Sequence, residues 1–82
     1  MELLADTVEL MISEDYKDRF KAEYYQTKIR YERLHKMVTK YEAKTLEFEP
    51  KVPIDILVGQ KRAMGEYLHY LEIRAEIEHI KL

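Results

Sequence analysis

One stretch of this sequence, residues 16–43, repeats apolar side chains with the alternating spacing of three and four residues that packed helices require. The repeat runs through Phe20, Tyr24, Thr27, Tyr31, Leu34, Val38 and Tyr41. Thr27 is its one polar member, and neither proline nor glycine interrupts the stretch. The pattern therefore predicts a long helix that packs along another helix. Ser13, which two acids follow, is predicted to cap the start of this helix.

A second seam of the same kind follows in the C-terminal half. It runs through Ile54, Leu57, Lys61, Met64, Leu68, Leu71 and Ala75, with Lys61 as the exception. Pro50 and Pro53 separate the two seams, and prolines so close together cannot continue a helix. We expect the connection between the helices to be extended, with Leu46 and Phe48 packed back onto the helices.

The N-terminal residues show a weaker helical pattern, with Leu4, Val8, Met11 and Ile12 at helical spacing. The sequence thus predicts an all-α fold with one domain, residues 1–82. It consists of a helical arm (1–13), a helix (14–44), a connection (45–53) and a helix (54–81). The two long helices form an antiparallel hairpin.

The hairpin has more apolar surface than its two seams can bury. A separate stripe on the second helix holds Ala63, Tyr67, Tyr70, Ile73, Ile77 and Ile80. Because 82 residues bury only a thin core, we expect a homo-oligomer that covers this surplus. Gly59 and Gly65 lie inside the second helix, where they either admit a close neighbour or ligand or are merely tolerated.

Charge is distributed unevenly, although the net charge is only -2. Residues 1–16 contain five acids and no base, while residues 17–44 contain nine bases and four acids. A local basic excess on a nearly neutral protein favours a compact anionic partner over a nucleic-acid polymer, or it simply keeps the helix solvated. With neither a signal peptide nor a membrane-spanning run, we expect a soluble intracellular protein with no membrane partner.

Aromatic and basic side chains share a face of the first long helix. Tyr24, Lys28 and Tyr31 follow one another at helical spacing, and a basic stripe holds Arg33, Lys36, Lys40 and Lys44. Tyrosine can stack on a base while lysine or arginine pairs with phosphate, which is the chemistry of nucleotide capture. The same tyrosines are also suited to a packed core.

Catalytic groupings are missing from the sequence. There is no cysteine, one serine and no glycine-rich phosphate loop, so we expect no enzyme and no cofactor. Three Glu-x-x-His pairs, at Glu32, Glu66 and Glu76, are reminiscent of half of a di-iron site. The carboxylates that would complete such a site are absent from the seams, so solvated flank pairs are the favoured interpretation and no metal is expected.

Two segments resemble a known family. EYYQTKIRYERLHKM in the first long helix and QKRAMGEYLHYLEIRAEIE in the second are similar to small phage and prophage proteins typified by the anti-CBASS cyclic-nucleotide sponge. The matching positions are Glu23, Tyr24, Thr27, Lys28, Arg30, Arg33, Leu34, Met37, Gln60, Ala63, Met64, Tyr67, Leu71, Arg74 and Glu76.

This resemblance implies a homohexamer that sequesters cyclic di- and trinucleotide immune signals, without cleaving them, in the cytoplasm of an infected bacterial host. It places base stacking on Tyr24, and the basic partner near Thr39 or Lys40, of which Lys40 is the cation. It places Arg62, two residues before Met64, at a trinucleotide pocket. Independently of the resemblance, the helical spacing makes Lys28 a candidate phosphate partner beside Tyr24. The alternative function is a helical protein-interaction or assembly module without a small-molecule ligand.

Overall fold

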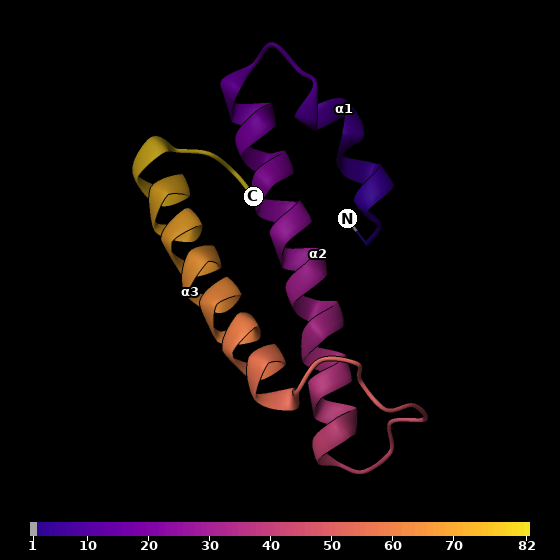
Figure 1. Cartoon of the computed structure of the whole chain (residues 1–82). Coiled ribbons are helices and arrows are strands. Elements are labelled where there is room, and N and C mark those ends of the chain that lie inside the picture. The colour runs from indigo at the N-terminus through magenta and orange to yellow at the C-terminus, as the bar shows by residue number, and fades with distance from the viewer. Residues whose placement is uncertain (1) are drawn as a thin grey trace.

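The computed structural model describes residues 2–82, and the regular structure within them is entirely helical. A 3-10 turn, η1 (Leu4–Thr7), leads into α1 (Val8–Met11), and the long helices are α2 (Tyr16–Glu42) and α3 (Ile54–Glu78). Figure 1 shows α2 and α3 antiparallel and side by side, with α1 against the other side of α2. The expected all-α fold of one short and two long helices is confirmed.

The two long helices face each other in one continuous antiparallel register. Side chains that meet across the hairpin are Tyr24 with Glu72, Tyr31 with Gly65, and His35 with Lys61. The first two pairs are seven residues apart on both helices, and the last two pairs are four apart on both. A single register therefore extends over most of the length of the hairpin.

The predicted seams point inward, and the core lies at one end of the hairpin. Its buried members come from the first half of α2, the second half of α3 and the residues just after α3: Phe20, Tyr24, Leu68, Leu71, Ala75 and Ile80. Toward the connection Val38 of α2 is still buried, whereas Leu57, Lys61 and Met64 of α3 are only half-buried. Tyr41, the last residue of the α2 seam, is 39% exposed.

The start of α2 corrects the predicted cap. Asp15, not Ser13, is the N-cap, and its carboxylate accepts from the Lys17 backbone N–H at 2.9 Å. Ser13 instead accepts from the Asp15 N–H and donates to the Asp18 carboxylate at 2.9 Å. The chain is extended at Asp15, which lets this nearer carboxylate reach the first turn while Ser13 braces the preceding turn.

Both long helices end earlier than predicted, and both end in a left-handed residue that is not glycine. Lys44 has φ 63° just after α2, and His79 has φ 57° just after α3. The backbone N–H of Ile80 donates to Ala75 O at 2.9 Å, which turns Ile80 back into the core. In the connection, residues 43–53, the prediction for Phe48 is wrong, since its side chain is 59% exposed.

The N-terminal arm, residues 2–13, packs on α2 of its own chain. Its anchor is Thr7, whose side chain is fully buried and whose hydroxyl accepts from the Gln26 amide at 2.8 Å. The apolar residues expected to form the packing face are partly exposed, with Ile12 72% exposed. The helical part of the arm is too short to present a continuous apolar face, so a polar contact fixes it instead.

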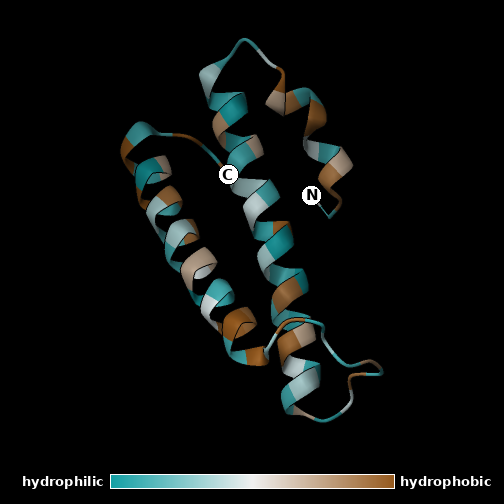
Figure 2. Ribbon diagram, viewed as in Figure 1, coloured by the Kyte–Doolittle hydropathy of each residue, from teal (hydrophilic) through white to brown (hydrophobic). Residues whose placement is uncertain are grey.

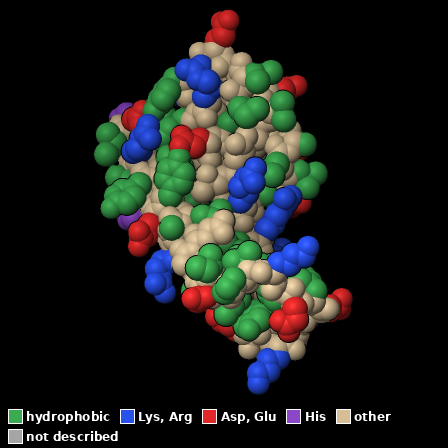
Figure 3. All heavy atoms as spheres, viewed as in Figure 1, with side chains coloured by type: hydrophobic (Ala, Val, Ile, Leu, Met, Phe, Trp, Pro, Cys, Tyr) green, Lys and Arg blue, Asp and Glu red, His purple; other side chains and the backbone are tan. Residues whose placement is uncertain are grey.

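The second apolar stripe of α3 is exposed in the single chain. Tyr70 and Ile77 are 65% and 71% exposed, while Ile80 is buried because the chain turns at His79. Figure 2 shows that the first turns of α3 are strongly hydrophobic, and Figure 3 shows hydrophobic side chains over α3 and around its first turns. The hairpin thus leaves one apolar face of α3 without a partner within residues 2–82.

Leu71, which is 1% exposed, tests the placement of the core. We expect Leu71→Ala to lower the free energy of unfolding by about 2–4 kcal/mol, because it removes buried methyl groups and leaves a cavity. Leu3→Ala, at a position 57% exposed, is the matched control and should change it by less than about 0.5 kcal/mol. Urea denaturation followed by circular dichroism measures both. Equal losses would contradict the core described above.

Candidate functional site

A hollow of about 740 Å³ lies over α3 and reaches the facing side of α2. Its lining residues are Tyr31, Val58, Lys61, Arg62, Gly65, Glu66, His69 and Tyr70. The volume falls in the usual range for small-molecule sites in proteins. Two tyrosines and two cations line the same hollow, which combines the residue types that bind bases and phosphates.

The shape of the hollow follows from the ridges of α3. Residues four apart form ridges along a helix, and two neighbouring ridges pass through the hollow. The first ridge is Val58, Arg62, Glu66 and Tyr70, and the second is Lys61, Gly65 and His69. Because Gly65 has no side chain, the second ridge is notched at its centre. The Tyr31 ring from α2 fills the back of this notch, with Cε1 3.3 Å from the position of a Gly65 Cβ.

The two glycines of α3 make a matched pair for testing this notch. A Cβ on Gly59 would meet nothing within 4 Å, whereas one on Gly65 would press on the Tyr31 ring. Since glycine destabilises a helix interior, we expect Gly59→Ala to add about 0.5–1 kcal/mol of stability. Gly65→Ala should add clearly less, or destabilise, because the ring must move. Equal gains in thermal and urea denaturation would contradict the close contact at Gly65.

Lys61 joins the two helices at the loop-side end of the hollow. Its ammonium nitrogen is 3.2 Å from His35 Nδ1, across the hairpin. His35 lies parallel to the Tyr31 ring, with an interplanar angle of 5° and centroids 6.2 Å apart. Lys61, the one polar residue of the predicted α3 seam, thus contacts a ring nitrogen of His35 on α2.

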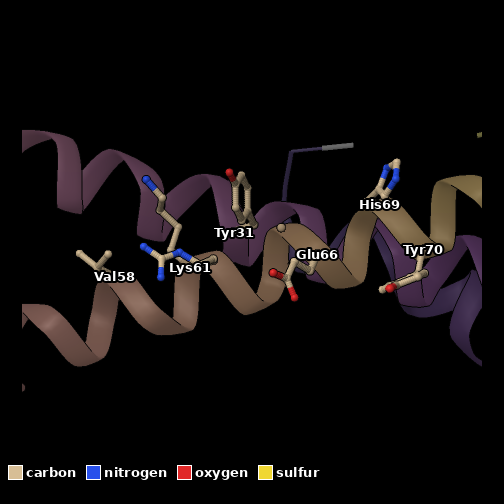
Figure 4. Close-up of a pocket in the computed structure, with 8 residues that line it drawn as sticks. Tyr31, Val58, Lys61, Glu66, His69 and Tyr70 are labelled. Carbon is tan, nitrogen blue, oxygen red and sulfur yellow. The ribbon is translucent and has the colours of Figure 1, made fainter.

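Charge and aromatic surface are arranged on both sides of α3. Figure 4 shows Tyr31 and His69 on one side of the α3 ribbon and Glu66 and Tyr70 on the other, with Lys61 directed toward α2. The Glu66 carboxylate therefore points away from the notch. This arrangement can accept an anionic ligand with an aromatic base beside the Tyr31 notch.

Tyr24, the residue expected to stack on a base, is 5% exposed and belongs to the core. Its hydroxyl donates to the Glu72 carboxylate at 2.7 Å, the Tyr25 ring meets it edge-on at 5.2 Å, and the Lys28 ammonium is 5.8 Å from its ring centre. Burial, and after it the hydrogen bond to Glu72 and that negative charge, raise the pKa of Tyr24 well above the ordinary 10.0. The phenol is therefore a permanent donor.

The raised pKa of Tyr24 predicts a pH-dependent stability. The folded state keeps the phenol proton, so its contribution is complete below pH 10 and is lost as pH rises above that unfolded-state value. At pH 8, Tyr24→Phe should cost about 0.5–1.5 kcal/mol through the lost hydrogen bond. At pH 11 this cost should shrink by about 1.4 kcal/mol, because the unfolded wild type then loses its proton. Urea denaturation at pH 8 and pH 11 measures the free energy of unfolding of wild type and variant. A difference between the two proteins that stays the same at both pH values would contradict the raised pKa.

The other expected site residues lie apart from one another. Lys40 is exposed and lines a small hollow at the connection, while Met64 is half-buried in the seam. Tyr24 and Lys40 are about 24 Å apart along α2, at 1.5 Å per residue, so one chain cannot bring them to one ligand. Of the five expected residues, the structure brings Tyr24 and Lys28 together and places Arg62 in the large hollow.

Sequence reasoning placed Tyr31 on the aromatic face of the first long helix but missed the residues of α3 that join it in the hollow. Lys61 was assigned to the seam, and Tyr70 to the surplus stripe. Two signals in the sequence could have found them. Lys61 interrupts an apolar seam, and Gly65 lies one helical turn after it. A charged residue followed one turn later by a glycine, both on the inner face of a helix, indicates a place where a ligand can fit.

Residues 2–82 contain neither a cluster of metal ligands nor a membrane-spanning helix. No group of three or more histidines and acids in this part of the chain is placed to hold a metal ion. No helix in the same residues is long and apolar enough to cross a membrane.

Comparison with known proteins identifies the family. No curated protein and no solved structure matches the chain. The family model described as Sequestin matches residues 14–77, which include all of α2 and all of α3 except Glu78. That name indicates a function in sequestering a ligand. The resemblance noted in the sequence is thereby confirmed: the chain belongs to the Sequestin family, in keeping with a sponge of the anti-CBASS cyclic-nucleotide type.

Proposed function

We propose that this protein binds cyclic di- or trinucleotide immune signals and sequesters them intact. The observation that carries the proposal is the hollow at Gly65, where Tyr31 and Tyr70 lie with Lys61 and Arg62. Cyclic oligonucleotides present bases to stack and phosphates to neutralise, which are the two chemistries that the residues of this hollow offer. The Sequestin family name supports the proposal, and the site of action is then the cytoplasm of an infected bacterial host.

The charges of the hollow suit a phosphate ligand. Within residues 2–82 the one ion pair joins Arg74 and Glu78, so neither Lys61 nor Arg62 forms an ion pair, and Glu66 is the one carboxylate that lines the hollow. Arg62 is exposed at the rim, where its planar guanidinium can bind two phosphate oxygens at once. Tyr70, 65% exposed, offers a ring for base stacking. These residues supply affinity from stacking and from charge-assisted hydrogen bonds.

Sequestration requires that the ligand is not consumed. The chain has no cysteine, and its one serine, Ser13, is held by Asp15 and Asp18 at the start of α2. The polar groups of the hollow are two cations, two tyrosines, one histidine and the Glu66 carboxylate, and no serine or cysteine nucleophile is among them. We therefore propose capture without turnover, in which the protein lowers the free concentration of the signal.

Tyr24 and Lys28 form a second candidate for the base. A stacking role requires that Tyr24 gains an exposed face, since it is 5% exposed in the single chain. Lys28, half-buried beside the same ring, would then meet a phosphate. We assign stacking in the hollow to Tyr31 and Tyr70 and leave the Tyr24 pair to the test below.

A homo-oligomer is part of the proposal. The exposed stripe at Tyr67, Tyr70, Ile73 and Ile77 continues directly from the hollow, because Tyr70 belongs to both. A second copy seated on the stripe would also wall the hollow and exclude water from the ligand. The family resemblance favours six subunits, which light scattering of the purified protein can count.

The same stripe supports a second candidate function, an assembly or interaction module that binds a protein. In that case the stripe is covered by another protein and the hollow binds no nucleotide. The two functions differ in what the purified protein binds and in how the stripe is buried.

Titration calorimetry decides between them. We expect saturable heat with at least one of cyclic di-AMP, cyclic di-GMP and cyclic tri-AMP, and mass analysis should recover that ligand unchanged. Recovery of a linear product would overturn sequestration without cleavage. Absence of binding to all three would overturn the nucleotide proposal and favour the protein-interaction module.

Matched variants locate the site in the same experiment. Arg62→Gln should weaken binding at least about tenfold, because a hydrogen bond to a charged group contributes about 1.5–3 kcal/mol. Arg30→Gln removes another exposed arginine, outside the hollow, and should leave binding within about twofold. If Tyr24→Leu abolishes binding while Arg62→Gln has no effect, the ligand lies at the Tyr24 pair instead.

A further inference from the structure

Lys61 is the one charged residue in the seam of α3, and it is half-buried. A lysine ammonium has three donors and no acceptor. The atom facing it at 3.2 Å, His35 Nδ1, must therefore accept. That bond requires a neutral imidazole whose proton is on Nε2. The contact thus fixes both the position of the amine and the tautomer of the ring.

His35 is itself held in place by a chain of contacts that returns to α3. Tyr31 stands one helical turn before it, parallel to its ring at 5°. The Tyr31 ring in turn rests on Gly65, with Cε1 3.3 Å from the position of a Cβ. Lys61 and Gly65 are again one turn apart on α3. Four residues, two from each helix, therefore support one another around the edge of the hollow.

We propose that His35 is a positioning residue that holds the Lys61 amine at the edge of the hollow to bind a phosphate of the ligand. The inference rests on the proposed function and assigns the role of phosphate anchor to a residue pair. One ammonium proton bonds to His35, which leaves two for phosphate oxygens. Lys61 can then bind the ligand without leaving its partner.

Such holding matters because a free lysine loses rotamer freedom when it binds, and that loss weakens affinity. A lysine already fixed by His35 loses less. The pair itself is partly exposed, so it should contribute little to the stability of the hairpin. Binding and stability therefore respond differently to changes at His35, which separates positioning from a structural role.

Two substitutions separate the aromatic ring of His35 from its hydrogen-bond acceptor. His35→Phe keeps a ring against Tyr31 but has no acceptor, while His35→Asn keeps an acceptor near the position of Nδ1 but no ring. Using whichever of cyclic di-AMP, cyclic di-GMP and cyclic tri-AMP binds wild type most tightly, we expect His35→Phe to raise Kd about 3- to 10-fold. His35→Asn should stay within about twofold. Circular dichroism and urea denaturation confirm that both variants fold.

A double-mutant cycle with Lys61→Met provides the decisive readout. In the Lys61→Met background, His35→Phe should have no further effect on Kd, because the amine it positions is gone. Additive effects, or an equal loss in His35→Asn and His35→Phe, would overturn the inference while leaving nucleotide binding established. Long-range ¹H–¹⁵N correlation of the ligand-free protein should show His35 Nδ1 without a proton. A proton on His35 Nδ1 would overturn this inference whether or not any of the three nucleotides binds. Lack of binding by all three nucleotides would overturn the proposed function, which is a separate result.

Discussion

The antiparallel register between α2 and α3 is the constraint on which the rest of the molecule depends. At the buried end it is fixed by a directional contact, the 2.7 Å hydrogen bond between Tyr24 and Glu72, within a core that includes Leu71. A slip of one turn would break that bond and move the Tyr31 ring onto a residue with a side chain instead of Gly65. The core end therefore sets the geometry of the hollow, and Tyr31, which packs against the core, also lines the hollow.

The buried cluster and the hollow occupy different parts of the hairpin, and this division separates stability from binding. The first half of α2 and the second half of α3 contain the buried cluster, with Tyr24 protected enough that the pKa of its phenol is raised. At the hollow, Lys61 and Tyr31 are half-buried. A rigid core that holds a more open end suits a binding site, because the ligand meets preorganised groups without the whole fold becoming loose.

Much of the fold could be predicted from the sequence, because heptad spacing determines which face of each helix is buried. Heptad spacing does not determine how two helices are shifted along each other, so the meetings of Tyr31 with Gly65 and of His35 with Lys61 could not be foreseen. The seam put Tyr24 on the buried face, but its hydrogen bond to Glu72 could not be foreseen for the same reason, since that partner is far away in sequence. The helix ends were placed too late because Lys44 and His79 adopt a left-handed conformation that glycine usually marks.

Two departures from an ideal helix pattern meet at one place. Lys61 puts a charge into an apolar seam, and Gly65 puts a residue of low helix propensity one turn later. Each lowers the stability of α3 by itself, and a sequence selected for a stable hairpin alone would have neither. In the structure the glycine admits Tyr31, Tyr31 aligns His35, and His35 accepts from Lys61. Lys61 and Gly65 both depart from the pattern of a stable helix, and the structure brings them together at one place. A binding site that requires both residues explains the two departures at once.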